Sequence, residues 1–81
     1  MSDTRITLDY PISINGAQIE VISLRRPKVR DMLSVDKSAK SDAEKEIQLF
    51  SHLSELSPED LMALDMADYA KLQQAYQDFL S

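Results

Sequence analysis

Several residue types that often decide the character of a small protein are absent or scarce in this 81-residue chain. It has no cysteine, which excludes disulfides and thiolate metal sites. Its single glycine, Gly16, excludes a glycine-rich phosphate-binding loop, and its three prolines give little reason to expect long loops. No apolar run approaches the roughly 18 residues of a membrane span. The apolar content of 43% is ordinary for a globular protein, and the length predicts one domain over residues 1–81.

The charged residues are distributed unevenly. The formal charge is −5, yet residues 1–40 carry seven basic and five acidic groups, whereas residues 41–81 carry two basic and nine acidic groups. Nucleic-acid binding requires clustered cations, so the strongly acidic second half is unsuited to it. A chain with a basic part and an acidic part is suited to head-to-tail contacts between copies, or to different partners on different faces. We therefore expect self-association.

The first 26 residues predict a β-hairpin. Apolar residues occupy every second position from Ile6 to Ile14, as in a half-buried strand. Asn15-Gly16 follows, which is a strong signal for a two-residue type I′ turn. Such a turn fixes the register of the two strands. It predicts three apolar cross-strand pairs: Ile14 with Ala17, Ile12 with Ile19, and Tyr10 with Val21.

The hairpin pattern contains two irregularities. Pro11 has no backbone N–H, which predicts an edge or a local break in the ladder. The apolar positions of the second strand change from odd to even numbers between Val21 and Ile22, which predicts either a bulge near residues 21–22 or a strand end buried on both faces. If this end were exposed, Ile22 and Leu24 would form an apolar surface that another chain has to cover.

A basic tract lies where the β pattern ends. Residues 25–31 read RRPKVRD and hold four of the nine basic residues of the chain. One interpretation is a solvated helix start whose cations pair with nearby acids. The others are a surface that binds carboxylates of another protein and a weak nucleic-acid footprint. The candidate partner-binding residues are Arg25, Arg26, Pro27, Lys28, Arg30, Ile22 and Leu24.

Helical patterns fill the rest of the chain. Pro27 can open a first helix at about residues 28–36, with an apolar stripe of Val29, Met32 and Leu33 that ends at Asp36, and a polar connector follows over residues 37–40. The later helices carry wide apolar faces. These faces hold Ile47, Leu49, Phe50, Leu53 and Leu56, then Leu61, Met62 and Leu64, then Met66, Tyr69, Leu72, Tyr76, Phe79 and Leu80.

Three start signals place these later helices. Ser41 and Glu44 have the spacing of a capping box, Ser57-Pro58 has an N-cap followed by proline at the first helical position, and Asp65 can cap the last helix. The predicted fold class is therefore α+β: a two-stranded hairpin over residues 5–26, followed by three to four short helices over residues 28–80.

No group of residues has the composition of a catalytic or metal site. His52 is the only histidine and falls on the polar side of its predicted helix, so we interpret it as a solvated surface residue. Negative charge is favourable in the first turn of a helix, and four carboxylates fit such positions: Glu59, Asp60, Asp65 and Asp68. The shared helical face of Tyr69, Tyr76 and Phe79 is typical of a core. We expect no catalytic residue, metal or cofactor.

The order of these motifs resembles a known family. Residues 11–16 (PISING) lead to residues 24–32 (LRRPKVRDM), and later come residues 53–61 (LSELSPEDL), 64–69 (LDMADY) and 77–80 (QDFL). Together, from about residue 8 to the end, they resemble the small tail assembly chaperones of contractile-tailed phages and prophages of the Mu and P2 kind. By position, Arg25, Arg26, Pro27 and Asp31 match the strand-to-helix motif of that family, and Asp65, Asp68 and Tyr69 match its C-terminal motif. Glu55 stands where the family pattern implies glycine.

The resemblance implies a non-enzymatic role. Such chaperones bind the long, largely helical tape measure protein, keep it soluble and help to recruit tail tube subunits around it. The implied partners are the tape measure protein and the tail tube protein, in the cytoplasm of a bacterial host and not in the mature virion. Nucleic acid, membrane and small-molecule substrates are not expected. The alternative from the residues alone is a small DNA-binding regulator or antitoxin-like protein that uses residues 25–30.

Overall fold

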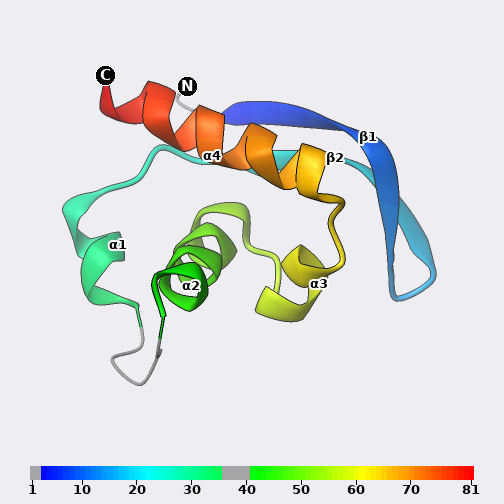
Figure 1. Cartoon of the computed structure of the whole chain (residues 1–81), viewed down its shortest axis with the longest axis horizontal. Coiled ribbons are helices and arrows are strands. Elements are labelled where there is room, and N and C mark those ends of the chain that lie inside the picture. The colour runs from blue at the N-terminus through cyan, green and yellow to red at the C-terminus, as the bar shows by residue number, and fades with distance from the viewer. Residues whose placement is uncertain (1–2, 36–40) are drawn as a thin grey trace.

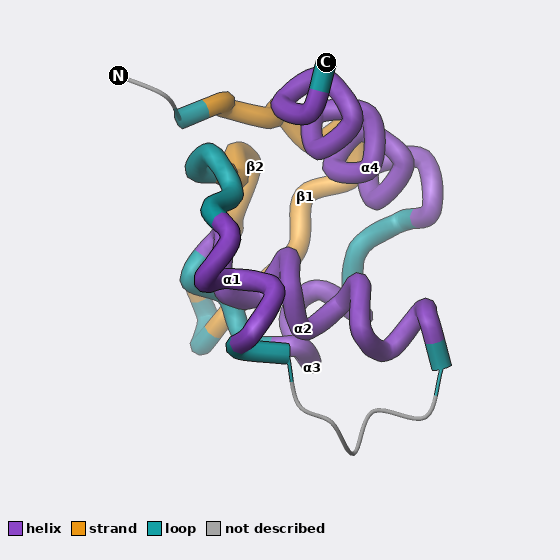
Figure 2. Tube along the Cα trace, turned by 90° about the vertical axis from the view of Figure 1, so that its left-hand side faces the viewer, coloured by secondary structure: helices purple, strands orange, loops and turns teal. Residues whose placement is uncertain are grey.

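The computed structural model describes residues 3–35 and 41–81 and shows an antiparallel hairpin followed by four helices, which confirms the predicted α+β class. The elements are β1 (Thr4–Ile14), β2 (Ala17–Leu24), α1 (Val29–Leu33), α2 (Asp42–Ser54), α3 (Pro58–Met62) and α4 (Met66–Leu80). In Figure 1, α4 runs alongside the hairpin at the top of the view, and α1, α2 and α3 follow one another from left to right below it. α4 packs against β1 and α2 against β2. Figure 2 shows β1 passing between α4 above and α2 below.

The turn of the hairpin is the one that the sequence predicts. Asn15 and Gly16 have positive φ angles of 52° and 83°, as a type I′ turn requires at both central positions. The pairs nearest the turn, Ile14 with Ala17 and Ile12 with Ile19, are the predicted ones.

A bulge in β1 changes the register beyond these pairs. Thr7 pairs with Val21, so residues 8–11 of β1 face the single residue Glu20 of β2. The predicted pairing of Tyr10 with Val21 is therefore wrong. The extra residues lie in the first strand and not near residues 21–22 of the second, and they include Pro11, the residue that cannot donate to the ladder.

The bulge decides which side chains reach the core. Paired residue numbers sum to 31 near the turn and to 28 beyond the bulge, so even-numbered residues of both strands face the same side at the far end. Ile6 and Leu8 of β1 are buried there together with Ile22 and Leu24 of β2, which are 2% and 0% exposed. The expectation that Ile22 and Leu24 belong to an exposed partner-binding surface is corrected by this burial.

α1 is shorter than predicted and begins later. It covers Val29–Leu33, and its N-cap is Lys28, whose backbone N–H donates to Asp31 Oδ2 at 2.7 Å. Pro27 therefore precedes the helix and does not form its first turn. The predicted end of the stripe at Asp36 and the connector over residues 37–40 lie outside the described residues.

The other three helices begin where the sequence predicts. Ser41 Oγ accepts the N–H of Glu44 at 3.1 Å, although the Glu44 carboxylate meets the Ser41 hydroxyl and not the backbone N–H of the predicted reciprocal box. Ser57 and Asp60 form a complete capping box at the start of α3, and Asp65 caps α4 with its side chain. Each such cap satisfies a backbone N–H that the helix leaves unpaired.

The hairpin and the helices share one hydrophobic core. Phe50 of α2 is fully buried, and its ring centroid lies 5.6 Å from that of Tyr69 and 5.8 Å from that of Tyr76, both in α4. Such aromatic pairs stabilise a fold by about 0.5–1.5 kcal/mol beyond the burial of their area. This confirms that the aromatic residues of α4 pack in the core. The other buried apolar residues are Ile6, Leu8, Ile12, Ile22, Leu24, Leu53, Leu61, Leu64, Leu72, Ala75 and Phe79.

Candidate partner-binding surface

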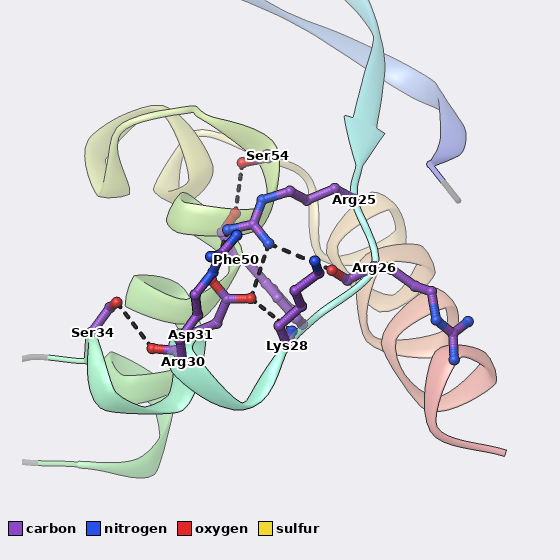
Figure 3. A network of polar contacts seen from close by, with 8 residues as sticks. All are labelled: Arg25, Arg26, Lys28, Arg30, Asp31, Ser34, Phe50 and Ser54. Atoms are coloured by element: carbon purple, nitrogen blue, oxygen red, sulfur yellow. Dashed lines mark hydrogen bonds and ion pairs between the residues drawn. The ribbon is translucent and has the colours of Figure 1, made fainter. Parts of the chain in front are cut away.

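The first arginine of the basic tract forms an intramolecular ion pair. Arg25 Nη1 and Nη2 donate to Asp31 Oδ2 and Oδ1 at 2.9 and 2.7 Å, a two-pronged ion pair in which the Asp31 side chain is almost fully buried (Figure 3). The hydrogen bonds from Arg25, reinforced by the backbone N–H of Lys28, outweigh burial and hold the pKa of Asp31 well below its usual range. The backbone N–H of Arg25 donates to the carbonyl of Leu53 in α2 at 3.1 Å. Arg25 therefore fixes the strand-to-helix junction.

The second arginine connects the junction to the end of α4. Arg26 Nη2 donates to the backbone carbonyl of Phe79 at 3.0 Å, and its guanidinium lies 5.5 Å from the centre of the Phe79 ring. In Figure 3 its side chain points away from the other cations, toward α4. A cation is favourable at the carboxyl end of a helix, where carbonyl groups are left unpaired. Arg26, like Arg25, therefore has a structural task.

The remaining two cations of the tract are available for contacts. The side chains of Lys28 and Arg30 are exposed and form no ion pair within residues 3–35 and 41–81. Because Arg25 is paired with Asp31 and Arg26 is directed toward α4, only half of the cations in the tract are free for contacts. This weakens the nucleic-acid interpretation, which depends on clustered free cations.

α1 exposes apolar side chains beside these cations. Val29, Met32 and Leu33 are 77%, 67% and 80% exposed, although the sequence places them on a stripe that would normally face a core. Val29 and Leu33 are four residues apart and lie on the same side of the helix, next to Arg30. We call Val29, Arg30 and Leu33 the outer face of α1.

The other side of α1 borders a groove. Its volume is about 590 Å³, and it is lined by residues of α1, α2, α4 and the segments that flank α1: Pro27, Lys28, Met32, Val35, Lys45, Glu46, Leu49 and Tyr76. The Glu46 carboxylate is hydrogen-bonded within the molecule, because its Oε1 accepts from the Tyr69 hydroxyl at 2.6 Å and from Gln73 Nε2 at 2.9 Å. Burial together with this carboxylate raises the pKa of Tyr69 above its usual range. We call this feature the α1–α2 groove.

A buried carboxylate, Asp68, joins α4 to the hairpin at the bulge. Asp68 is 0% exposed, and its two oxygens accept the backbone N–H groups of Asp9 and Tyr10 at 2.9 Å each. Lys71 Nζ lies 3.4 Å from Asp68 and 3.0 Å from Asp9 Oδ2, and donates to the carbonyl of Thr7 at 2.9 Å. Burial alone would raise the pKa of Asp68, but the two backbone N–H groups and Lys71 outweigh it and lower that pKa.

Sequence reasoning placed Asp68 in the first turn of a helix, where its charge is favourable, and missed this contact. The signal available in the sequence was the bulge-forming Pro11, which implies unpaired N–H groups nearby without saying which side chain accepts them. Asp60 and Asp65 do have the predicted capping roles.

The single histidine of the chain lies on the surface. His52 is exposed, as predicted. Within the described part of the chain, no three His, Cys, Asp or Glu side chains are grouped so that they could hold a metal ion. The helices described here include none that is long and apolar enough to span a bilayer.

Comparison with known proteins identifies the family of this chain. The family model described as phage tail assembly chaperone proteins, E, or 41 or 14, matches residues 5–81, which is nearly the whole chain. No curated protein and no solved structure gives a significant match. The matched region contains the strand-to-helix junction, the outer face of α1, the α1–α2 groove and Asp68. On this match, the chain belongs to the phage tail assembly chaperone family.

Proposed function

We propose that this protein is a non-enzymatic chaperone that binds the tape measure protein of a phage tail and assists assembly of the tail tube around it. Membership of the family supports a role in tail assembly. The observation that carries the proposal is the outer face of α1, where Val29 and Leu33 are largely exposed beside Arg30. Adjacent exposed apolar side chains with a polar rim are typical of a protein-binding surface.

Within the basic tract we divide the candidate residues by task. Arg30 contacts the client directly, together with Val29 and Leu33. Arg25 and Arg26 act indirectly: Arg25 joins the end of β2 to Asp31 of α1 and to Leu53 of α2, and Arg26 joins the segment before α1 to the end of α4. Pro27 lies between Arg26 and the N-cap of α1. A client that covers Val29 and Leu33 would gain up to about 1.5–3 kcal/mol for each side chain fully buried.

Co-expression with the tape measure gene from the same tail gene cluster tests the proposal. We expect the tape measure protein to become soluble and to co-purify with this chain. A variant carrying Val29→Ser and Leu33→Ser should bind at least tenfold more weakly. Leu80→Ser, which changes a 61% exposed apolar residue at the end of α4, should bind as the wild type does.

The possible failures of this experiment have different meanings. If the wild-type chain and the tape measure protein remain separate at micromolar concentration, the proposed function is wrong. If they associate and the double variant binds equally well, the function stands and the assignment of the surface is wrong. We further propose that the chaperone acts in the host cytoplasm and leaves before the tail is complete, so mass spectrometry of purified virions should not find it.

A further inference from the structure

We propose that the α1–α2 groove binds a second copy of this chain, through the corner between α3 and α4, so that copies associate head to tail. We define the corner by four residues: Glu59, Met62, Asp65 and Met66. The proposal goes beyond client binding, because the outer face of α1 does not line the groove and the contact requires no tape measure protein. It also gives the expected self-association a specific pair of surfaces.

The groove has an apolar floor and a positive rim. Met32, Val35, Leu49 and Tyr76 contribute apolar surface, and the volume of about 590 Å³ has room for more than one side chain of methionine size. Lys28 and Lys45 lie at the rim, are exposed, and make no ion pair within the described ranges. The one carboxylate in the lining, Glu46, accepts hydrogen bonds from Tyr69 and Gln73 of the same chain. The groove is therefore suited to an apolar occupant that carries negative charge.

The corner of another copy has this chemistry. Met62 and Met66 are 66% and 75% exposed, and methionine is flexible enough to fill an irregular apolar groove. Glu59 and Asp65 are exposed next to them. The whole segment over residues 46–70 contains six acidic residues and no lysine or arginine, so no cation within it neutralises the corner.

The placement of the two surfaces determines the kind of assembly. Figure 1 shows α1 at one end of the row of helices and α3 at the other, with α2 between them. In a head-to-tail contact the groove of one copy holds the corner of the next and the contact is not reciprocated, so it is heterologous. The two ends of the assembly then keep one free groove and one free corner, and copies can add until the chain closes into a ring. The groove is lined by eight residues and the corner is defined by four, whereas a standard stable interface has about 20–30 residues on each side. The association is therefore weak and depends on concentration.

Sedimentation of the purified chain tests the proposal. The average mass should increase steadily from micromolar to millimolar concentration at low salt, and less so at high salt, because salt screens exposed charges. Lys45→Glu in the groove and Glu59→Lys in the corner should each weaken the association by about tenfold or more. Arg5→Glu makes the same change of charge as Lys45→Glu, at an exposed residue of β1, and is its matched control, expected to sediment like the wild type. Circular dichroism checks that all variants fold.

Mixing the two variants gives the decisive measurement. Lys45→Glu retains an intact corner and Glu59→Lys an intact groove, so the mixture should associate more strongly than either variant alone. Their remaining surfaces, a lysine corner and a glutamate groove, are also complementary.

A wild-type chain that stays monomeric at millimolar concentration and low salt would overturn the proposal. So would a mass that stops at two copies, an equal effect of Arg5→Glu, or a mixture that stays monomeric. Binding of the tape measure protein is measured separately, and none of these outcomes bears on it. If Lys45→Glu weakens only tape measure binding and leaves sedimentation unchanged, the occupant of the groove is the client and the head-to-tail contact is wrong.

Discussion

Asp68 accepts the backbone N–H of Tyr10 at 2.9 Å, across 58 residues of sequence, and with its other oxygen accepts that of Asp9. These two N–H groups lie in the bulge, where β1 has more residues than β2 can pair. The carboxylate therefore replaces the missing ladder partner and at the same time attaches α4 to the hairpin. An unpaired N–H in this position would be costly.

Replacing this carboxylate should loosen both elements. In Asp68→Asn one acceptor oxygen becomes an NH₂ group that faces a backbone donor, so we expect a lower free energy of unfolding in urea. Hydrogen exchange of the Tyr10 amide should become faster than that of residues near the turn. Asp3→Asn, at an exposed position, is the control and should leave both measurements unchanged. Equal protection of the Tyr10 amide in Asp68→Asn and wild type would contradict the role of Asp68.

Stability should decrease in acid because two buried carboxylates have lowered pKa values. The pKa values of Asp31 and Asp68 are lower in the folded chain than the ordinary value of 3.8. Near and below pH 4 the unfolded chain therefore binds protons that the folded chain does not, and this favours unfolding. The contribution of both groups is fully present at neutral pH and is lost as the pH falls below about 5.

Urea unfolding between pH 7 and pH 2 measures this loss. The dependence on pH should become shallower in Asp31→Asn and in Asp68→Asn, since each variant lacks one group whose pKa changes on folding. A variant with Asp3→Asn should follow the wild-type curve. An unaltered acid dependence in both core variants would show that other carboxylates are responsible.

Arg26 should contribute to stability and not only to surface charge. Arg26→Ala removes the hydrogen bond to the Phe79 carbonyl and the contact with the Phe79 ring, so we expect a loss of about 1 kcal/mol. Hydrogen exchange in the last turn of α4 should become faster. Arg30→Ala removes a cation of the same tract that has no such contacts, and should change the free energy of unfolding by less than about 0.5 kcal/mol.

Glu55→Gly should stabilise the protein. Glu55 ends α2 with a positive φ of 63°, a conformation that costs a residue with a side chain about 1 kcal/mol and that glycine adopts freely. We expect the free energy of unfolding to rise by about 0.5–1 kcal/mol. As a control, Ala43→Gly inside the first turn of α2 should lower it by a comparable amount. A destabilised Glu55→Gly variant would show that the Glu55 side chain compensates for the strain.

The left-handed conformation at position 55 also explains why the family pattern has glycine there. The family resemblance implies glycine at this position, and the structure supplies the physical reason: the chain must turn sharply between α2 and α3. Asp31, another residue of the resemblance, proves to be the partner of Arg25. Positions that the resemblance selected are thus explained by local geometry, which a single sequence does not reveal.

The sequence by itself determined the local structure. The type I′ turn, the two pairs beside it, the three N-caps at Ser41, Ser57 and Asp65, and the apolar faces of α2 and α4 depend on neighbours within a few residues, and short-range hydrogen bonding and periodicity specify them. The tertiary structure decided the long-range contacts. Asp68 meets the bulge and Arg26 meets the end of α4 across more than 50 residues, so the register of β1, the burial of Ile22 and the contact of Arg26 with α4 follow only from packing. The Arg25–Asp31 pair is local and agrees with the interpretation in which cations of the tract pair with nearby acids. Packing also leaves the apolar side chains of α1 exposed, because the side of that helix that faces the rest of the molecule carries the buried Asp31.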